Sequence, residues 1–276
     1  MTSYFSRMTS YHPYHPVDIN LSGKFVENDF SPYTLIIAFA TTWALVLGAT
    51  LFAVRRFYPR LSIKDQGLFL WFILTGSIHI FFEGYFVYNH ARMASMTDFF
   101  GQLWKEYALS DSRYMSSDTF LLTIETWTVI LWGPLSYLTA VFITKNSQFR
   151  YTVQALVSTG ELYGNLLYLV TSLLDEYITG RRYYRPEPLY FWVYFVLMNS
   201  IWLFVPGFAL YDSIMASARS FEYSDPPIGG KRIRKAKDEG SKKEKEYRTK
   251  VPASQESDTR SRRGGKTKSY NDDFSG

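Results

Sequence analysis

Five long apolar segments constrain the fold of this chain more than any other feature of its sequence. Each is between 22 and 26 residues long. A helix needs about 20 apolar residues to cross a hydrocarbon core about 30 Å thick, and only helices and closed barrels satisfy their backbone there. Barrels show short alternating strands, unlike the block YTLIIAFATTWALVLGATLF. The sequence therefore predicts an all-α, polytopic membrane protein, a five-transmembrane-helix bundle with spans at 33–54, 66–91, 119–144, 151–174 and 188–211.

The flanks of the apolar region have a different composition. Residues 1–32 form a polar N-terminal segment without the apolar stretch of a cleaved signal peptide, so the first helix is expected to direct insertion. Residues 33–215 form the transmembrane domain. Residues 216–276 are expected to be a disordered basic tail, because positions 231–276 hold 15 Lys and Arg against 8 Asp and Glu and few apolar residues. No folded nucleic-acid-reading module accompanies the tail, so lipid is its expected contact and nucleic acid is not.

The basic residues also predict an orientation. Lys and Arg are denser in 55–65, in 145–150 and at the start of the tail than in the segments on the opposite side of the membrane. Short cytoplasmic loops carry the excess of Lys and Arg. The C-terminus is therefore expected in the cytosol.

The composition excludes several kinds of chemistry. The chain has no cysteine, so disulfides, thiolate nucleophiles and iron–sulfur clusters are excluded. It has four histidines and no Walker loop, G-x-S-x-G elbow or H-E-x-x-H motif. We therefore expect neither a metal nor another cofactor. What remains is acid–base chemistry by carboxyl groups and imidazole.

Three of the five spans carry one carboxylate each. These are Glu83, Glu125 and Glu161. A charge near the bilayer centre costs about 3 kcal/mol or more, so such a residue usually faces the protein interior or a wet cavity. In a low-dielectric pocket, desolvation can keep a glutamic acid protonated, and a neutral acid can give up a proton.

Two of these carboxylates share a depth in the membrane. Glu83 precedes the end of its span by eight residues, and Glu125 is the seventh residue of the next span. At 1.5 Å per residue, both lie about 10 to 12 Å from the same face. His79 is one turn deeper than Glu83 on the same helix side, and Asn199 reaches the level of His79. A common pocket could gather all four side chains.

Neighbouring residues add to this layer. Thr128 lies one turn from Glu125, and Trp202 one turn from Asn199. Structural roles stay open for each: His79 and Glu83 could be only a hydrogen-bonded pair, Asn199 could bond a neighbouring helix, and Trp202 could be core packing.

Several motifs carry a resemblance to a known family. Taken together, the following stretches resemble the emopamil-binding protein family, the sterol 8(7)-isomerases with an EXPERA domain: IHIFFEGYFV (78–87), QLWKEYALSDSRY (102–114), ETWTVILWGPLS (125–136), ELYGNLLY (161–168) and LYFWVYFVLMNSIWLFVPG (189–207). The resemblance covers about residues 28–215, and its strength lies in the order and spacing of the motifs.

The resemblance implies a multi-pass enzyme of the endoplasmic reticulum membrane, with 33–215 as its catalytic domain. It would move a sterol double bond from C8=C9 to C7=C8 by protonation at C9, a carbocation at C8 and deprotonation at C7, without a redox cofactor. The implied partners are a zymosterol- or fecosterol-like sterol, the lipid bilayer, and cationic amphiphilic amines as carbocation mimics. A homodimer is left open. The alternative is a non-catalytic membrane protein of the same fold that binds sterols or amphiphilic amines.

The resemblance also implies roles for single residues. Its catalytic set falls on His79, Glu83, Glu125, Thr128, Asn199 and Trp202, and its expected substrate-binding residues are Tyr114, Trp192 and Phe195. His79 and Glu83 would supply the C9 proton. Glu125, oriented by Thr128 and Asn199, would receive the C7 proton, although donor and acceptor could be reversed. Trp202 would face the cation. Glu161 is left out of the site, because the family tends to place its acid at the position of Asn165.

Overall fold

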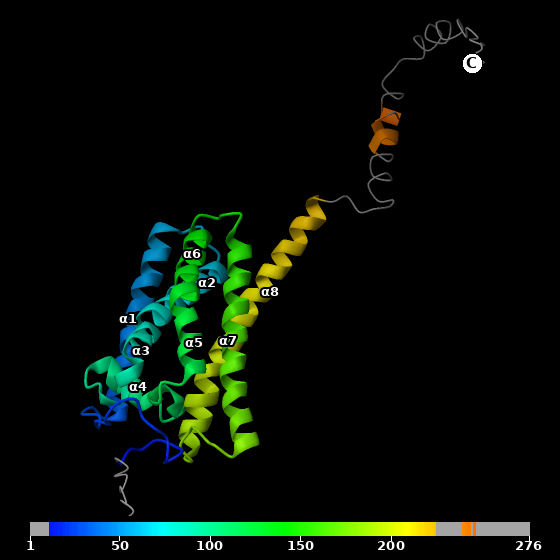
Figure 1. Ribbon diagram of the computed structural model, residues 1–276. Helices are drawn as coiled ribbons and strands as arrows, with labels where there is room; N and C mark the ends of the chain where they lie inside the picture. The colour runs from blue at the N-terminus through cyan, green and yellow to red at the C-terminus, as the bar shows by residue number, and fades with distance from the viewer. Residues whose placement is uncertain (1–10, 225–238, 244, 247–276) are drawn as a thin grey trace, which may run out of the picture. The chain divides into compact units, whose positions relative to one another are not determined.

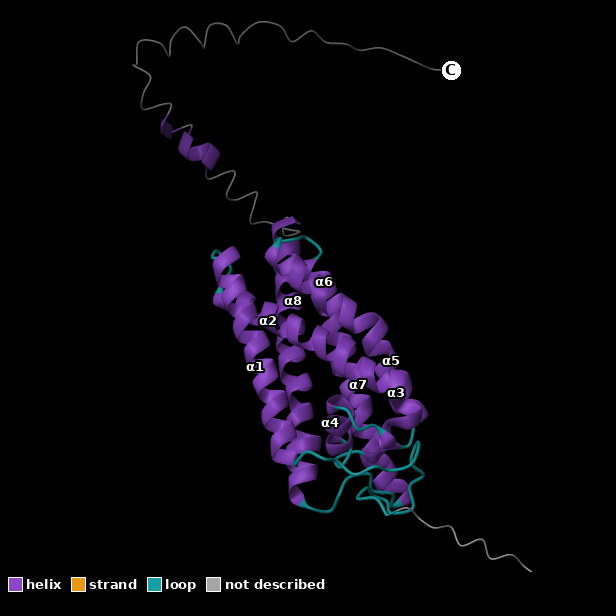
Figure 2. Cartoon of the chain, turned by 90° about the vertical axis from the view of Figure 1, so that its left-hand side faces the viewer, coloured by secondary structure: helices purple, strands orange, loops and turns teal. Residues whose placement is uncertain are grey.

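The computed structural model describes residues 11–224, 239–243 and 245–246, and in these residues the regular structure is helical (Figures 1 and 2). The α-helices are α1 (Pro32–Phe57), α2 (Ile63–Ser77), α3 (Gly84–Asn89), α4 (Phe99–Tyr107), α5 (Thr119–Trp127), α6 (Gly133–Thr144), α7 (Arg150–Thr179) and α8 (Met198–Ser224). Between them lie π-helices η1 (Ile78–Glu83), η4 (Thr128–Trp132) and η5 (Leu189–Leu197), and 3-10 helices η2 (His90–Ser95) and η3 (Ser112–Met115).

Four helical runs in the described part of the chain are long and apolar enough to cross a membrane. They are Pro32–Phe57, Ile63–Ser95, Thr119–Thr144 and Leu189–Ser220. The predicted all-α membrane class is confirmed. The predicted span at 151–174 corresponds to α7, which is a 30-residue helix but is not among the four. Its buried residues are mostly polar, which lowers its hydropathy.

Local signals in the sequence set several helix ends. Ser31 accepts a hydrogen bond from the Thr34 backbone, with Pro32 at the first helical position of α1. Asp118 caps α5 by accepting from the Leu121 backbone. Helix α7 ends at Gly180, which has φ of 74°, a left-handed conformation that favours glycine.

Small residues allow close packing of α2 on α6. A Cβ at Gly76 would lie 3.1 Å from the Gly133 carbonyl oxygen, and a Cβ at Gly133 would lie 2.7 Å from the Ile80 side chain. Such close approach of backbones is how helices associate where no water drives them together. It brings η1 against η4, where the predicted acid–base residues lie.

The polar N-terminal segment has no helix from residue 11 to 31 and packs against the loops around α4, at the lower end in Figure 2. Tyr14 donates to the Lys105 carbonyl at 3.1 Å, and the Lys105 ammonium donates to the Val26 carbonyl at 2.6 Å. The Ser22 backbone donates to the Met115 carbonyl at 2.6 Å. These bonds tie the segment to the loops that lead into the bundle.

The start of the predicted tail differs from expectation. Helix α8 continues through Ser224, so residues 216–224 are helical, because the run that begins MASAR is rich in good helix formers. Residues 239–243 are also helical. The predicted disorder at 225–238, 244 and 247–276 lies outside the described residues.

Candidate functional site

A cavity of about 830 Å³ lies within the helical domain. This volume falls in the range of about 300 to 1,000 Å³ that is usual for ligand pockets. Its walls are mostly apolar and aromatic, and they come from α1, η1, α4, η3, α5, η4, α7, η5 and α8. Residues that line it include Phe39, Phe82, Trp104, Trp132, Tyr168 and Tyr190.

His79 and Glu83 form a hydrogen-bonded pair on one wall. The His79 Nδ1 and Glu83 Oε2 atoms are 2.7 Å apart, and the Thr128 hydroxyl donates to the same oxygen. Both members of the pair lie on η1, and Thr128 begins η4. Single π-helical turns inside α-helices frequently occur at functional sites, because they change which side chains face inward. The two π-helices thus bring the pair and Thr128 together.

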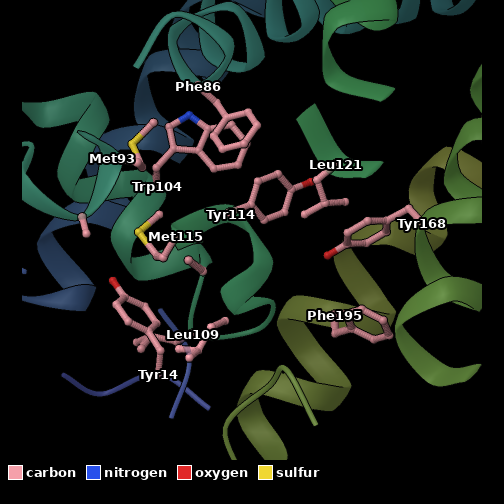
Figure 3. Packing of buried hydrophobic residues seen from close by; sticks show 13 residues of the cluster. Tyr14, Phe86, Met93, Trp104, Leu109, Tyr114, Met115, Leu121, Tyr168 and Phe195 are labelled. Atoms are coloured by element: carbon pink, nitrogen blue, oxygen red, sulfur yellow. The ribbon is translucent and has the colours of Figure 1, made fainter. Parts of the chain in front are cut away.

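Glu125 lies beside this pair on α5. Tyr114 donates from its hydroxyl to Glu125 Oε1 at 2.6 Å, and Glu83 and Glu125 line the same cavity. Burial raises the pKa of Tyr114, which keeps this phenol a donor. Figure 3 shows the Tyr114 ring between Trp104 and Tyr168, with centroid distances of 4.8 and 6.2 Å.

The expected orientation of Glu125 by Thr128 and Asn199 is wrong. Thr128 is hydrogen-bonded to Glu83 and to the backbone carbonyl of Glu125, so it does not hold the Glu125 side chain. The Asn199 amide donates to the Phe195 carbonyl at 2.8 Å and to the Tyr107 hydroxyl at 3.2 Å. The group that holds the Glu125 carboxyl is Tyr114, which the sequence suggested only as a substrate contact.

Glu161, left out of the predicted site, lies in the same cavity. Its Oε1 accepts a hydrogen bond from Thr75 at 2.9 Å and is 3.6 Å from His79 Nε2. The Thr75 hydroxyl is also 3.1 Å from His79 Nε2. The signal for Thr75 was its place one turn before His79, and the signal for Glu161 was the pattern of one carboxylate per span.

Comparisons with known proteins agree with this arrangement. The family description "EXPERA (EXPanded EBP superfamily)" matches residues 99–213. The 3-beta-hydroxysteroid-Delta(8),Delta(7)-isomerase of the rat, Rattus norvegicus, is 36% identical over 210 residues, which cover 76% of this chain and 90% of the rat protein. The chain belongs to the EXPERA superfamily. The resemblance predicted from its motifs is confirmed.

Other members of the superfamily show the same relation. The protein of the same name from the guinea pig, Cavia porcellus, is 37% identical over 204 residues, which cover 74% of this chain and 87% of that protein. A rice protein, from Oryza sativa subsp. japonica, is named a probable 3-beta-hydroxysteroid-Delta(8),Delta(7)-isomerase. It is 34% identical over 196 residues, which cover 71% of this chain and 87% of the rice protein.

The predicted site residues on η5 and α8 of this EXPERA chain differ in their relation to the cavity. Trp202 lines the cavity and packs against Trp71 at a centroid distance of 5.6 Å. Trp192 is 62% exposed, and Phe195 is fully buried and stacked on Phe191. Neither Trp192 nor Phe195 lines this cavity, and their expected role as substrate contacts stays a prediction. The π-helical winding of η5 turns other positions inward, namely Leu189, Tyr190, Val193 and Tyr194.

A fourth carboxyl group in the cavity, beside those of Glu83, Glu125 and Glu161, was not among the predicted residues. Glu106, on α4, lines the cavity and accepts a hydrogen bond from the Tyr194 hydroxyl at 3.2 Å. Burial raises the pKa of Glu106, and the bond from Tyr194 opposes that rise. It lies in the segment between two predicted spans, which the search for charges inside the spans did not cover. No group of three or more His, Asp or Glu residues in the described ranges could hold a metal ion.

Gly160 gives the Trp132 ring its place in the cavity wall. A Cβ at Gly160 would lie 2.4 Å from this ring. Gly160→Ala is therefore expected to lower the free energy of unfolding by about 1 to 3 kcal/mol, the usual cost of overpacking. Thermal unfolding of the purified protein in detergent measures this. Gly48→Ala is the matched control, because a Cβ there meets nothing within 4 Å. Equal unfolding midpoints for the two variants would contradict the packing described.

Proposed function

We propose that this chain is a sterol 8(7)-isomerase, which moves the double bond of a sterol ring from C8=C9 to C7=C8. The observation that supports it most strongly is the presence of two carboxyl groups, Glu83 and Glu125, on the wall of one apolar cavity of about 830 Å³. Relatives that cover most of the chain carry the name of this activity.

The reaction needs one acid and one base and no electron transfer. The His79–Glu83 pair gives a proton to C9 as the C8=C9 π electrons form the new C9–H bond, which leaves a carbocation at C8. Glu125 then takes a proton from C7, and the electrons of the C7–H bond become the C7=C8 double bond. Atoms and charge balance, because one proton enters the sterol and one leaves it. Glu83 and Glu125 suit these two roles, since both line the cavity and Thr128 bonds both the Glu83 carboxyl group and the Glu125 backbone carbonyl.

The cavity offers two means of stabilising the cation. The carboxyl groups carry compensating negative charge, and the aromatic face of Trp202 can contribute about 2 kcal/mol when the contact is desolvated. The apolar walls keep water from the cation. A cationic amphiphilic amine would mimic this intermediate and occupy the same place.

Glu106 and Tyr194 can form hydrogen bonds with the 3-hydroxyl group of the sterol. This group lies at the end of the ring system opposite the sterol side chain. Glu106→Leu is expected to raise KM for a 3-hydroxy sterol about tenfold with kcat little changed, since a lost hydrogen bond costs about 1 to 3 kcal/mol. The measurement is steady-state kinetics with the sterol and with its 3-methoxy analogue. The analogue cannot donate to the carboxyl group, so its KM is expected to stay within twofold. A similar rise for both substrates would place the hydroxyl elsewhere.

We further propose five spans, with α7 as the fourth, in the endoplasmic reticulum membrane with a cytosolic C-terminus. At 1.5 Å per residue, a helix of 30 residues reaches about 45 Å, enough to cross the bilayer. Polar residues inside a span usually face the bundle interior, as those on α7 do. Glycosylation acceptor sites placed in the tail and in the loop 181–187 would test this, and modification of the loop alone is expected.

The test of function is conversion by the purified protein. We expect a Δ8 sterol such as zymosterol or fecosterol, incubated in deuterated water, to give the Δ7 sterol with deuterium at C9. Gas chromatography with mass spectrometry identifies both. Binding of sterol or amine without conversion would overturn the proposal and support the non-catalytic alternative.

A further inference from the structure

Helix α7 buries a continuous polar face in the helical domain. Seven of its eight buried residues are polar, and they recur every three or four positions, so they lie along one side of the helix. They are Arg150, Gln154, Ser158, Glu161, Asn165, Tyr168 and Ser172. A span that only filled space would bury leucine and valine there.

Four successive members of this face have polar atoms that no other described residue satisfies. They are Arg150 Nε, Gln154 Oε1, Ser158 Oγ and Glu161 Oε2. Gln154 and Ser158 are fully buried, and the turn between them holds Val157 of an apolar cluster with Leu68, Phe72 and Ala140. A buried polar group without a partner costs about 1 to 3 kcal/mol. A row of such groups points to bound water, which serves them in globular proteins.

One end of this row reaches charged residues at the domain surface. The Gln154 amide lies 3.4 Å from Asp212 Oδ2, and Asp212 pairs with the Lys64 ammonium at 2.5 Å. The Lys64 side chain is 41% exposed. The row therefore begins where water has access.

The other end reaches the acid–base pair. Glu161 Oε1 accepts from Thr75, which lies 3.1 Å from His79 Nε2, and His79 Nδ1 is 2.7 Å from Glu83. Between the two ends, the steps from Gln154 to Ser158 and from Ser158 to Glu161 are each about one helical turn. One water molecule can bridge groups separated in this way.

We propose that Gln154, Ser158 and Glu161 let the proton of the His79–Glu83 pair exchange with the aqueous face near Asp212. This inference rests on the proposed function, in which the sterol gains one proton at C9 and loses one from C7, so a turnover consumes no proton. The proton that Glu125 takes from C7 returns to the neighbouring pair, and the path replaces it with one from water before the next turnover. Apolar walls keep water from the sterol, so this exchange needs a route that does not cross the substrate space. Glu161 is then a positioning and relay residue, which acts through His79.

Ser158→Ala tests the path, because it removes one hydroxyl without adding volume. In deuterated water, we expect the deuterium content at C9 of the product to fall to about half or less of the wild-type value, because protium taken from C7 then returns to C9. The kcat is expected to stay within about twofold, since a turnover consumes no net proton. The affinity for a cationic amphiphilic amine is expected to stay within twofold, which reports an intact cavity.

Two further variants extend the test. Glu161→Gln keeps the acceptor for Thr75 but cannot carry a proton. The double variant with Ser158→Ala is expected to place no less deuterium at C9 than the lower single variant, because both interrupt one path. Ser172→Ala is the control: it removes a buried hydroxyl from the same helix face beyond the site, and the wild-type deuterium content is expected. Wild-type deuterium content at C9 in the product of Ser158→Ala would overturn the path. Absence of conversion by the wild type would instead overturn the proposed function.

Discussion

Glu83→Gln is expected to lower the turnover of a Δ8 sterol by about a thousandfold or more. Glutamine keeps the shape of the side chain and its bonds to His79 and Thr128, but it cannot release a proton. General acid–base groups contribute about 10²- to 10⁴-fold to rates, and in the described part of the chain Glu83 is the hydrogen-bond partner of His79 Nδ1. Product formation by purified protein in detergent, followed over time by chromatography, measures the loss. His79→Ala is expected to have a similar effect because it removes the partner of the carboxyl group.

The matched control is Glu27→Gln, since Glu27 is an exposed carboxylate of the N-terminal segment. Its turnover is expected to equal that of the wild type. Binding of neutral sterol by Glu83→Gln is expected to stay within a few-fold, which separates loss of chemistry from loss of folding. Near-normal turnover by Glu83→Gln would remove the pair from the mechanism.

The membrane class could be predicted because the apolar residues form long, continuous segments. The predicted bounds lie close to those of the structure. The predicted span 33–54 corresponds to Pro32–Phe57, and the predicted span 119–144 corresponds to Thr119–Thr144. Helix α7 was predicted as a span from its length and its Pro- and charge-marked limits. The sequence did not reveal that its inner face would be polar, because that depends on which neighbours pack against it.

Glu83, Glu125, His79 and Asn199 were predicted to share one layer of the bundle, and all four line the cavity. The depth of a residue follows from the rise per residue of a helix, which is nearly constant. The direction in which a side chain faces depends on the winding of the helix, and three π-helices alter that winding at the site. No signal in the sequence distinguishes a π-turn from an α-turn. The sequence therefore did not show which residues of η5 would face the cavity.

The residues that hydrogen-bond the carboxyl groups from other helices could not be predicted from the sequence. Tyr114 holds Glu125 and Thr75 holds Glu161, and neither contact is at a helical spacing from its carboxylate. Tyr114 comes from η3, outside the candidate spans, where the depth argument does not apply.

Glu125→Gln is expected to lower turnover by about a thousandfold and also to weaken binding of a cationic amphiphilic amine by about ten- to a hundredfold. Glu125 is buried in the wall of the cavity, so in Glu125→Gln an ammonium group placed like the C8 cation would lose a charged partner in a site with little water. A hydrogen bond to a charged group contributes about 1.5 to 3 kcal/mol, which corresponds to this change in affinity. Isothermal titration with the amine and with a neutral sterol separates the two effects, since the neutral sterol is expected to bind as before.

Tyr114→Phe is the informative companion, because it keeps the Glu125 carboxyl and removes only the phenol that donates to it at 2.6 Å. If Glu125 acts as the base, its carboxyl group accepts the proton from C7 and the Tyr114 hydroxyl only orients that carboxyl group. The loss of turnover is then expected to be about tenfold, the cost of one hydrogen bond that orients a reacting group. Amine affinity is expected to rise or stay constant, since a carboxylate freed from Tyr114 can bond the ammonium instead. Equal loss of amine and neutral-sterol affinity in Glu125→Gln would show that this carboxyl group shapes the cavity and does not meet positive charge.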